Sequence, residues 1–440
     1  MKTQFQLFKA VFYLMLLAGF IGHAYADNVP VDSVRVVATN AFSYFSGKSP
    51  SETVIRNITP IAKNDTVIIY ICNFEKGFII VSADNAAYPV LGFSDEGNFS
   101  INDMPPAVEL ITNGYKDEIL HAKRTRTTAS EEIRNEWWKY LRNTVDRSFY
   151  APTHYLIQTK WAQKGGYRYP ETIGYNYFCP IGEYNQRTLV GCGAVALAQV
   201  LHYWACSVYP HGTAYNRQQD TLINLSGQNY EWYSMHEQKS DLHNAKLLAD
   251  CAYAINSIFG SSTTSYMDTI ALTLRNNFGF ANACLVYKFS DDEWITTLKN
   301  EISQRRPILY AGQNSTSNEG HGWIIDGYNQ NNFFHCNFGW GDRYNPNYID
   351  CDGWYLLSNI TPSGHNYDVG HHAIINCYPT TYTNTEFIDS NIQSGTYSGH
   401  KIVIENSSVN SNANVILDPD CSTEIFGPFS VPLGSTLHVK

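Results

Sequence analysis

The sequence predicts an α+β protein in three parts: an N-terminal α+β unit, a central unit with a helical half beside a strand-rich half, and a small all-β module at the end. Three observations carry this prediction. Apolar runs with strand character cluster in the first third, a helical apolar repeat begins near residue 192, and short strand-like runs fill the last sixty residues. The chain has 440 residues, which is enough for two or three domains.

The composition indicates a folded chain with a sizeable core. Hydrophobic residues make up 44% of the sequence and charged residues 16%, so extensive disorder is not expected. The abundance of tyrosine (31) and phenylalanine (22) favours strand-rich architecture. The formal net charge of −10 argues against nucleic acid as a partner.

The first 26 residues are predicted to be a signal peptide. Lys2 and Lys9 precede an apolar stretch over residues 10–21, which is too short to span a bilayer. Ala24-Tyr25-Ala26 forms an A-x-A cleavage site, so the mature chain is expected to begin at Asp27. An uncleaved membrane anchor is the alternative. No later run is apolar enough for a transmembrane segment, so we expect a secreted protein, with the periplasm or the cell surface as other destinations.

Residues 27–147 are expected to form the N-terminal α+β unit. Strand-like runs are found at residues 66–72, 77–82 and 90–93, and the short polar link between the first two predicts a hairpin. Pro105-Pro106 is expected to open a helix that runs from residue 107 to about residue 127. Residues 131–147 predict either a short helix or an exposed connector.

The central unit, residues 148–380, contains the most informative motif, Gly191-Cys192-Gly193. The small and apolar residues that follow Cys192 repeat with helical spacing, so Cys192 is expected at the start of a helix. A helix N-terminus carries partial positive charge, which favours a thiolate over a thiol. Gly191 would let a substrate backbone approach the sulfur. The alternative is a buried structural cysteine.

His321 is the candidate general base for a Cys192 nucleophile. It lies about 130 residues further along the chain, between Gly320 and Gly322 and just before an apolar strand, a setting that suits exposure in a cleft. Asn337 follows, and an Asn side-chain oxygen can orient an imidazole. A surface histidine and a turn asparagine are the alternatives. The order Cys, His, Asn is that of papain-like cysteine proteases.

Two further residues complete the candidate site. Gln163, upstream of Cys192, could form an oxyanion hole with the backbone N–H of Cys192, and a surface glutamine is the alternative. Trp340, between two glycines, could form a wall of the cleft or shield the contact between Asn337 and His321 from water. Equally, it could belong to the core. Residues 287–379 are expected to be strand-like, with turns at Asp326-Gly327 and residues 352–353.

No metal or cofactor is expected. The ten cysteines include no CxxC pair, which argues against a structural zinc site, and they show no familiar disulfide framework. His371 and His372 are neighbours, and neighbouring side chains on a strand point to opposite faces. The chain also lacks the HExxH, GxSxG and P-loop motifs.

Residues 381–440 are expected to form the C-terminal all-β module. The composition changes after residue 380, and strand-like runs recur at roughly ten-residue spacing, as in a small all-β domain. These runs cover residues 401–405, 414–417, 425–429 and 435–439.

Taken together, these motifs resemble the streptopain family of bacterial cysteine peptidases. The resemblance is carried by residues 159–163 (TKWAQ), Gly191-Cys192, residues 321–327 (HGWIIDG) and residues 337–341 (NFGWG). It implies a papain-like fold, with Cys192 and His321 as the catalytic pair and Gln163 as the oxyanion donor. It also places Asn337 and Trp340 near the histidine.

Upstream, residues 77–84 and 88–93 resemble the inhibitory propeptide of that family. The resemblance therefore implies that residues 27–147 block the cleft until they are removed. Two residues depart from the family pattern: Gly193 stands where valine is frequent, and Phe338 stands where tryptophan is common. A phenyl ring cannot donate a hydrogen bond, so any polar role of that indole is lost.

The sequence thus predicts a secreted cysteine endopeptidase made as a zymogen, with proteins or peptides as substrates and its own propeptide as inhibitor. Two alternatives remain. One is a secreted binding protein that has lost catalysis on a peptidase fold, and the other is a Cys-His amidase or acyltransferase. The intact set of Cys192, His321, Asn337 and Gln163 favours the peptidase.

Overall fold

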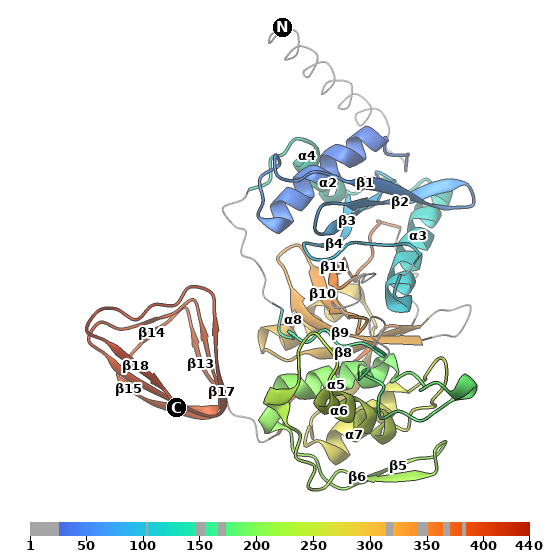
Figure 1. Cartoon of the computed structure of the whole chain (residues 1–440). Coiled ribbons are helices and arrows are strands. Elements are labelled where there is room, and N and C mark those ends of the chain that lie inside the picture. Colours follow the sequence, from blue (N-terminus) through green and yellow to red (C-terminus); the bar gives the residue numbers. More distant parts are fainter. Residues whose placement is uncertain are drawn as a thin grey trace.

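The computed structural model describes residues 26–102, 104–146, 155–165, 173–313, 320–341, 351–363, 370–380 and 384–440. Figure 1 shows an N-terminal unit above a central unit, with a separate β-rich part beside them. The predicted signal peptide, apart from Ala26, and the end of the predicted N-terminal unit lie outside the described residues. Within the described part of the chain, no helix is both long and apolar enough to cross a membrane.

The described part of the N-terminal unit contains three helices and four strands. Their bounds are α2 (Val31–Ser46), β1 (Asn57–Lys63), β2 (Thr66–Asn73), β3 (Phe78–Ser82), β4 (Val90–Ser94), α3 (Pro106–Thr125) and α4 (Glu131–Leu141). The three predicted strands and the helix opened by proline are confirmed, whereas α2 and β1 were not predicted. The open question at residues 131–147 resolves to a helix, since Ser130 caps α4 by accepting the Ile133 N–H at 3.2 Å.

The helical half of the central unit is formed by α5 (Cys192–Trp204), α6 (Leu242–Ala254) and α7 (Met267–Asn277), with a small hairpin of β5 (Thr213–Asn216) and β6 (Thr221–Asn224). Helix α5 is almost entirely buried, which explains its small and apolar composition. It packs against α6 on one side and the central sheet on the other. The predicted helix at Cys192 is confirmed.

The second half is strand-rich, as predicted, with one helix among the strands. Its elements are β7 (Cys284–Tyr287), α8 (Asp291–Ser303), β8 (Ile308–Gln313), β9 (Gly320–Tyr328), β10 (Phe333–Asn337), β11 (Gly353–Leu356) and β12 (His372–Ile375). The prediction missed α8, although its acidic first turn and the apolar spacing of Trp294, Leu298 and Ile302 are helix signals. The predicted turn at Asp326-Gly327 is wrong, because both residues lie within β9.

A single ten-stranded sheet runs through both units. Its order is β1-β2-β3-β4-β11-β10-β9-β8-β12-β7, so the N-terminal unit contributes four consecutive strands at one end. The junction is the antiparallel pair β4–β11, in which Phe93 lies opposite Trp354. Their rings stack with centroids 6.1 Å apart, so the two units share an aromatic core as well as a sheet.

The C-terminal module is all-β, as predicted, and its strands are parallel. Its elements are β13 (Asn384–Ile388), β14 (Asn391–Ile392), β15 (Gly395–Glu405), β16 (Ser408–Val409), β17 (Asn414–Phe426) and β18 (Thr436–Val439). One sheet has the order β13-β15-β17-β18, and β14 pairs with β16 in a second. The chain thus coils around a small apolar core, and the module has a triangular outline in Figure 1. A separate strand at residues 425–429 was predicted wrongly, since β17 ends at Phe426 and Gly427 turns the chain with φ +69°.

The module contacts the central unit through charged side chains. Lys401 Nζ donates to the backbone oxygen of Tyr203 at 2.7 Å and lies 4.5 Å from the centre of its ring. Arg305, after α8, pairs with Glu405 of β15. Cys206, close by in a short 3-10 turn, is disulfide-bonded, whereas eight cysteines of the described chain, including Cys192, are free.

Candidate active site

The candidate nucleophile Cys192 is held by a tightly constrained turn. Gly191, immediately before α5, has φ +96°, and a Cβ there would lie 2.9 Å from Cγ2 of Thr263. The same threonine donates its hydroxyl hydrogen bond to the backbone oxygen of Leu189 at 2.7 Å. Only glycine fits this position without strain, and the turn places Cys192 at the first position of α5.

Strand β9 meets the start of α5 at the sulfur. The backbone N–H of Gly322 donates to Sγ of Cys192 at 3.4 Å. A Cβ added to Gly322 would lie 3.7 Å from Cα of Gly193, which is ordinary van der Waals contact, so β9 runs close to the start of α5. His321 is the residue next to Gly322 and is half-buried. The structure therefore brings the helix of the candidate nucleophile and the strand of the candidate base together.

Burial raises the pKa of the Cys192 thiol above its ordinary value. The N–H groups of Gly322, Gly193 and Cys192 itself oppose this effect and lower the pKa. The predicted thiolate at the helix N-terminus is therefore not favoured in this form of the chain. Burial thus favours the thiol over the thiolate in this form of the chain, as suits a resting state.

Gln163 lies on a segment that is hydrogen-bonded to the residues just before Cys192. Its backbone oxygen accepts the N–H of Val190 at 3.1 Å, and its side chain is half-buried. The preceding residue, Ala162, forms an isolated β-bridge with Trp340. Trp340 remains 39% exposed, so it lies at the surface rather than in the core. Both Gln163 and Trp340 are thus placed around the start of α5.

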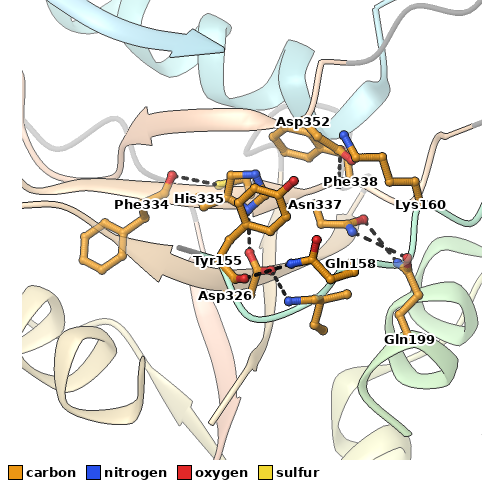
Figure 2. A network of polar contacts seen from close by, with 12 residues as sticks. Tyr155, Gln158, Lys160, Gln199, Asp326, Phe334, His335, Asn337, Phe338 and Asp352 are labelled. Atoms are coloured by element: carbon orange, nitrogen blue, oxygen red, sulfur yellow. Dashed lines mark hydrogen bonds and ion pairs between the residues drawn. The ribbon is translucent and has the colours of Figure 1, made fainter. Parts of the chain in front are cut away.

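The Asn337 side chain is buried, and its amide is engaged by other groups. It donates to the backbone oxygen of Thr159 at 2.8 Å, and its oxygen accepts from Nε2 of Gln199 at 3.2 Å and from the N–H of Gly339 at 3.1 Å. Figure 2 shows the contact between Gln199 and Asn337. In this form the asparagine joins α5, β10 and the segment before Gln163, and its role toward His321 stays a prediction.

The structure accounts for one departure from the family pattern. A Cβ at Gly193 would lie 2.5 Å from Oγ of Ser265 and 3.0 Å from Cδ1 of Ile270, so valine would have to displace both side chains. Phe338 is buried, its N–H donates to Asp352 at 2.8 Å, and its ring meets Tyr355 edge-on at 5.4 Å. The phenyl ring fills core space without needing a polar partner.

The N-terminal unit is fastened to the central unit by α3 and by a charged contact near the site. One carboxylate oxygen of Glu118, buried in α3, accepts from the N–H groups of Ile360 and Thr361 at 2.8 and 2.7 Å. Glu96, just after β4, pairs with Lys160 at 2.8 Å. Lys160 is buried three residues before Gln163, so this contact reaches the candidate oxyanion segment.

Sequence reasoning missed several residues that organise the site. Gln199 lies two turns after Cys192 and accepts the N–H of Trp161 at 3.1 Å. Asp326 was assigned to a turn and no role was predicted for His335, but the two form a buried pair. Glutamine in an otherwise apolar helix was the available signal for Gln199, because a buried amide needs partners. Within the described residues, no group of three or more His, Cys, Asp or Glu side chains is arranged to hold a metal ion.

Comparison with known proteins agrees with this architecture. Residues 169–348 match the peptidase C10 family, and residues 26–119 match the Spi protease inhibitor family. Streptopain of Streptococcus pyogenes is 25% identical over 326 residues, covering 67% of this chain and 75% of its own. The thiol protease/hemagglutinin PrtT of Porphyromonas gingivalis is 25% identical over 308 residues, covering 65% of this chain and 34% of its own. A fragment of prointerpain A of Prevotella intermedia matches with a TM-score of 0.55 and 23% identity, covering 74% of this chain and 99% of its own.

The chain is a cysteine peptidase that carries an inhibitor domain ahead of its peptidase domain, which is the organisation of a zymogen. Within that class, residues 169–348 match the peptidase C10 family, and streptopain is among the relatives of the chain. The resemblance seen in the motifs is thereby confirmed.

Proposed function

We propose that the protein is a secreted cysteine endopeptidase whose catalytic pair is Cys192 and His321. The observation that carries the proposal is the hydrogen bond from Gly322 to the Cys192 sulfur, because it seats the strand of His321 against the start of α5. The predicted signal peptide would direct the chain out of the cytoplasm and be cleaved after Ala26.

In the proposed mechanism, His321 takes the thiol proton and the thiolate of Cys192 attacks the peptide carbonyl carbon. The carbonyl oxygen becomes an oxyanion, which accepts hydrogen bonds from the Gln163 side chain and the Cys192 N–H. That N–H is free of helical partners because it belongs to the first turn of α5. His321 then protonates the leaving amine, and water hydrolyses the thioester with His321 as base.

The remaining candidate residues would orient the catalytic histidine or line the substrate cleft. Asn337 would orient the His321 ring once the inhibitor domain has left, while Gly191, Gly320 and Trp340 would line the substrate cleft. Gly320 is exposed at the start of β9, next to the proposed base. Exposed backbone at a glycine suits the close approach of an extended peptide.

The proposed organisation follows the predicted boundaries: a signal peptide over residues 1–26, an inhibitory propeptide over 27–147, a peptidase domain over 148–380 and the β module over 381–440. Strands β4 and β11 form an antiparallel pair, so one sheet continues from the N-terminal unit into the central unit. This pairing supports a propeptide that is docked through main-chain hydrogen bonds. Protein or peptide substrates would take its place after cleavage.

The test is hydrolysis of casein by the purified chain under reducing conditions, beside Cys192→Ala, with N-terminal sequencing of any processed form. We expect activity and processing in the parent and neither in the variant. An internally quenched peptide with both ends blocked identifies an endopeptidase, because an exopeptidase needs a free terminus. A parent that stays inert after another protease has removed the propeptide would overturn the proposal.

A further inference from the structure

We propose that Asp326 and His335 form a positioning pair that fixes residues 155–163, and therefore Gln163, against the catalytic strand. This inference rests on the proposed function, because Gln163 is the proposed oxyanion donor. Asp326 and His335 lie on neighbouring strands, β9 and β10, and their Oδ1 and Nδ1 atoms are 2.6 Å apart. Asp326 is fully buried and His335 is 4% exposed.

The carboxylate of Asp326 also holds the segment that precedes the site. Its second oxygen accepts the N–H of Ile157 at 2.8 Å, and its backbone oxygen accepts the N–H of Leu156 at 2.9 Å. The Tyr155 ring lies flat on the His335 imidazole, with centroids 4.0 Å apart and an angle of 8° (Figure 2). Three consecutive residues of the segment are therefore attached to one buried pair.

Gly327 permits this close packing. A Cβ at Gly327 would lie 3.1 Å from Cβ of His335 and 3.3 Å from Cβ of Tyr155. Both contacts are tighter than ordinary van der Waals distance, so the glycine lets the tyrosine and the histidine approach the strand together.

The attachment continues along the segment as far as Gln163. The backbone oxygen of Thr159 accepts from Asn337, and the N–H of Trp161 donates to Gln199. The backbone oxygen of Gln163 then accepts from Val190, two residues before Cys192. A series of hydrogen bonds along the segment thus leads from Asp326 to the residues just before Cys192, so loosening the segment at its start should displace its end.

A buried Asp–His pair is weak evidence for a role in stability alone, since apolar residues of similar size often stabilise a protein as well or better. What the Asp326 side chain adds is direction: one oxygen fixes the Ile157 N–H, and the other holds the His335 ring on which Tyr155 stacks. This matters most after maturation, because a cut near residue 147 would leave residues 155–163 close to a chain end, and chain ends fray unless they are attached. The pair keeps that end docked while the enzyme works.

The experiment compares Asp326→Asn, Asp326→Ala and Tyr155→Leu with the parent as matured enzymes. Loss of one oxyanion donor lowers kcat by about 10²–10³-fold, so a displaced Gln163 should lower kcat by roughly 10–100-fold while KM changes by less than about twofold. We expect the larger loss for Asp326→Ala and a smaller one for Asp326→Asn, which keeps one acceptor. Amide hydrogen exchange over residues 156–163 should accelerate in parallel.

Glu301→Gln is the matched control, because Glu301 is also a buried carboxylate that accepts a backbone N–H, from Asn376 at 2.7 Å, but it lies in α8. We expect it to lower the thermal midpoint without changing kcat. If Asp326→Ala lowers the midpoint like Glu301→Gln and leaves kcat unchanged, the pair is only structural and the proposal is wrong.

Should Asp326→Ala not fold, Tyr155→Leu decides, since it leaves the Asp326–His335 pair intact and removes only the ring stacked on His335. An unchanged kcat and unchanged exchange over residues 156–163 in that variant would overturn the proposal. If the parent itself shows no peptidase activity, the proposed function fails, and the exchange measurement still reports whether Asp326 docks the segment.

Discussion

Replacing Gly191 with alanine probes the turn that places Cys192. Alanine at φ +96° adopts a sparsely populated conformation, which costs about 1–3 kcal/mol. Its Cβ would also lie 2.9 Å from Cγ2 of Thr263, and overpacking of this kind costs about a further 1–3 kcal/mol. We therefore expect Gly191→Ala to destabilise the peptidase domain by about 3–4 kcal/mol, near the middle of the summed range.

The assay is thermal unfolding of the zymogen in a Cys192→Ala background, which prevents self-digestion. For a unit of 150–250 residues each kcal/mol shifts Tm by about 2–4 °C, so a decrease of roughly 6–16 °C is expected. Gly227→Ala is the control for backbone strain, because Gly227 has φ +77° and no atom within 4 Å of its built Cβ. Its cost should stay near 1–2 kcal/mol, or about 2–8 °C.

A second variant separates the two costs at Gly191. Thr263→Ser removes the crowding methyl group and retains the hydroxyl that donates to Leu189. Combined with Gly191→Ala, it should restore about 1–3 kcal/mol, which is the overpacking part. The reasoning about this turn is refuted if the losses of stability caused by Gly191→Ala and Thr263→Ser simply add in the double variant. It is also refuted if Gly191→Ala destabilises the protein no more than Gly227→Ala does.

Three other perturbations test the resting state. Glu118→Gln replaces the buried carboxylate that fastens α3 to the peptidase domain and so weakens its hydrogen bonds. Processing of the zymogen, followed on gels, should accelerate, and an unchanged rate would contradict the role of this contact. Burial raises the pKa of Cys192, so its alkylation by iodoacetamide in the zymogen should reach half its maximal rate above pH ~8.5. The measurement uses a zymogen in which the exposed Cys284 is changed to serine. A midpoint below neutral pH would exclude the protonated thiol. Glu96→Gln removes the charged partner of Lys160 and should lower zymogen stability by about 1–3 kcal/mol. The matured enzyme lacks residue 96 and serves as the control, and an unchanged stability of the zymogen would argue against the contact.

The strongest sequence patterns predicted the fold well. The hairpin of β2 and β3, the helix opened by proline and the helix at Cys192 all follow from local signals that the structure retains. Helix α2 was missed because it begins after Pro30 with no capping side chain. Asp326-Gly327 has the composition of a turn, but Asp326 finds partners inside the sheet, so tertiary packing overrides the local preference.

The candidate site was predictable only in part. Its residue types and order were readable, and the structure brings the segments of Cys192, His321 and Gln163 together. The partners of Asn337 could not be read from the sequence, because hydrogen bonds between residues 138 or more positions apart depend on the complete fold. The raised pKa of Cys192 is likewise a property of burial and not of its position on a helix.

The pairing of β4 with β11 joins strands that the ribosome makes at very different times. Phe93 and Trp354, opposite each other in the sheet, are separated by 261 positions of sequence. At 5–20 residues per second, β11 emerges roughly 13–50 seconds after β4. The N-terminal unit can complete its own four strands in that interval, and its last strand then offers a ready edge to the sheet that follows. A matured enzyme that unfolds has lost this edge, so we expect it to regain its structure more slowly than the zymogen does.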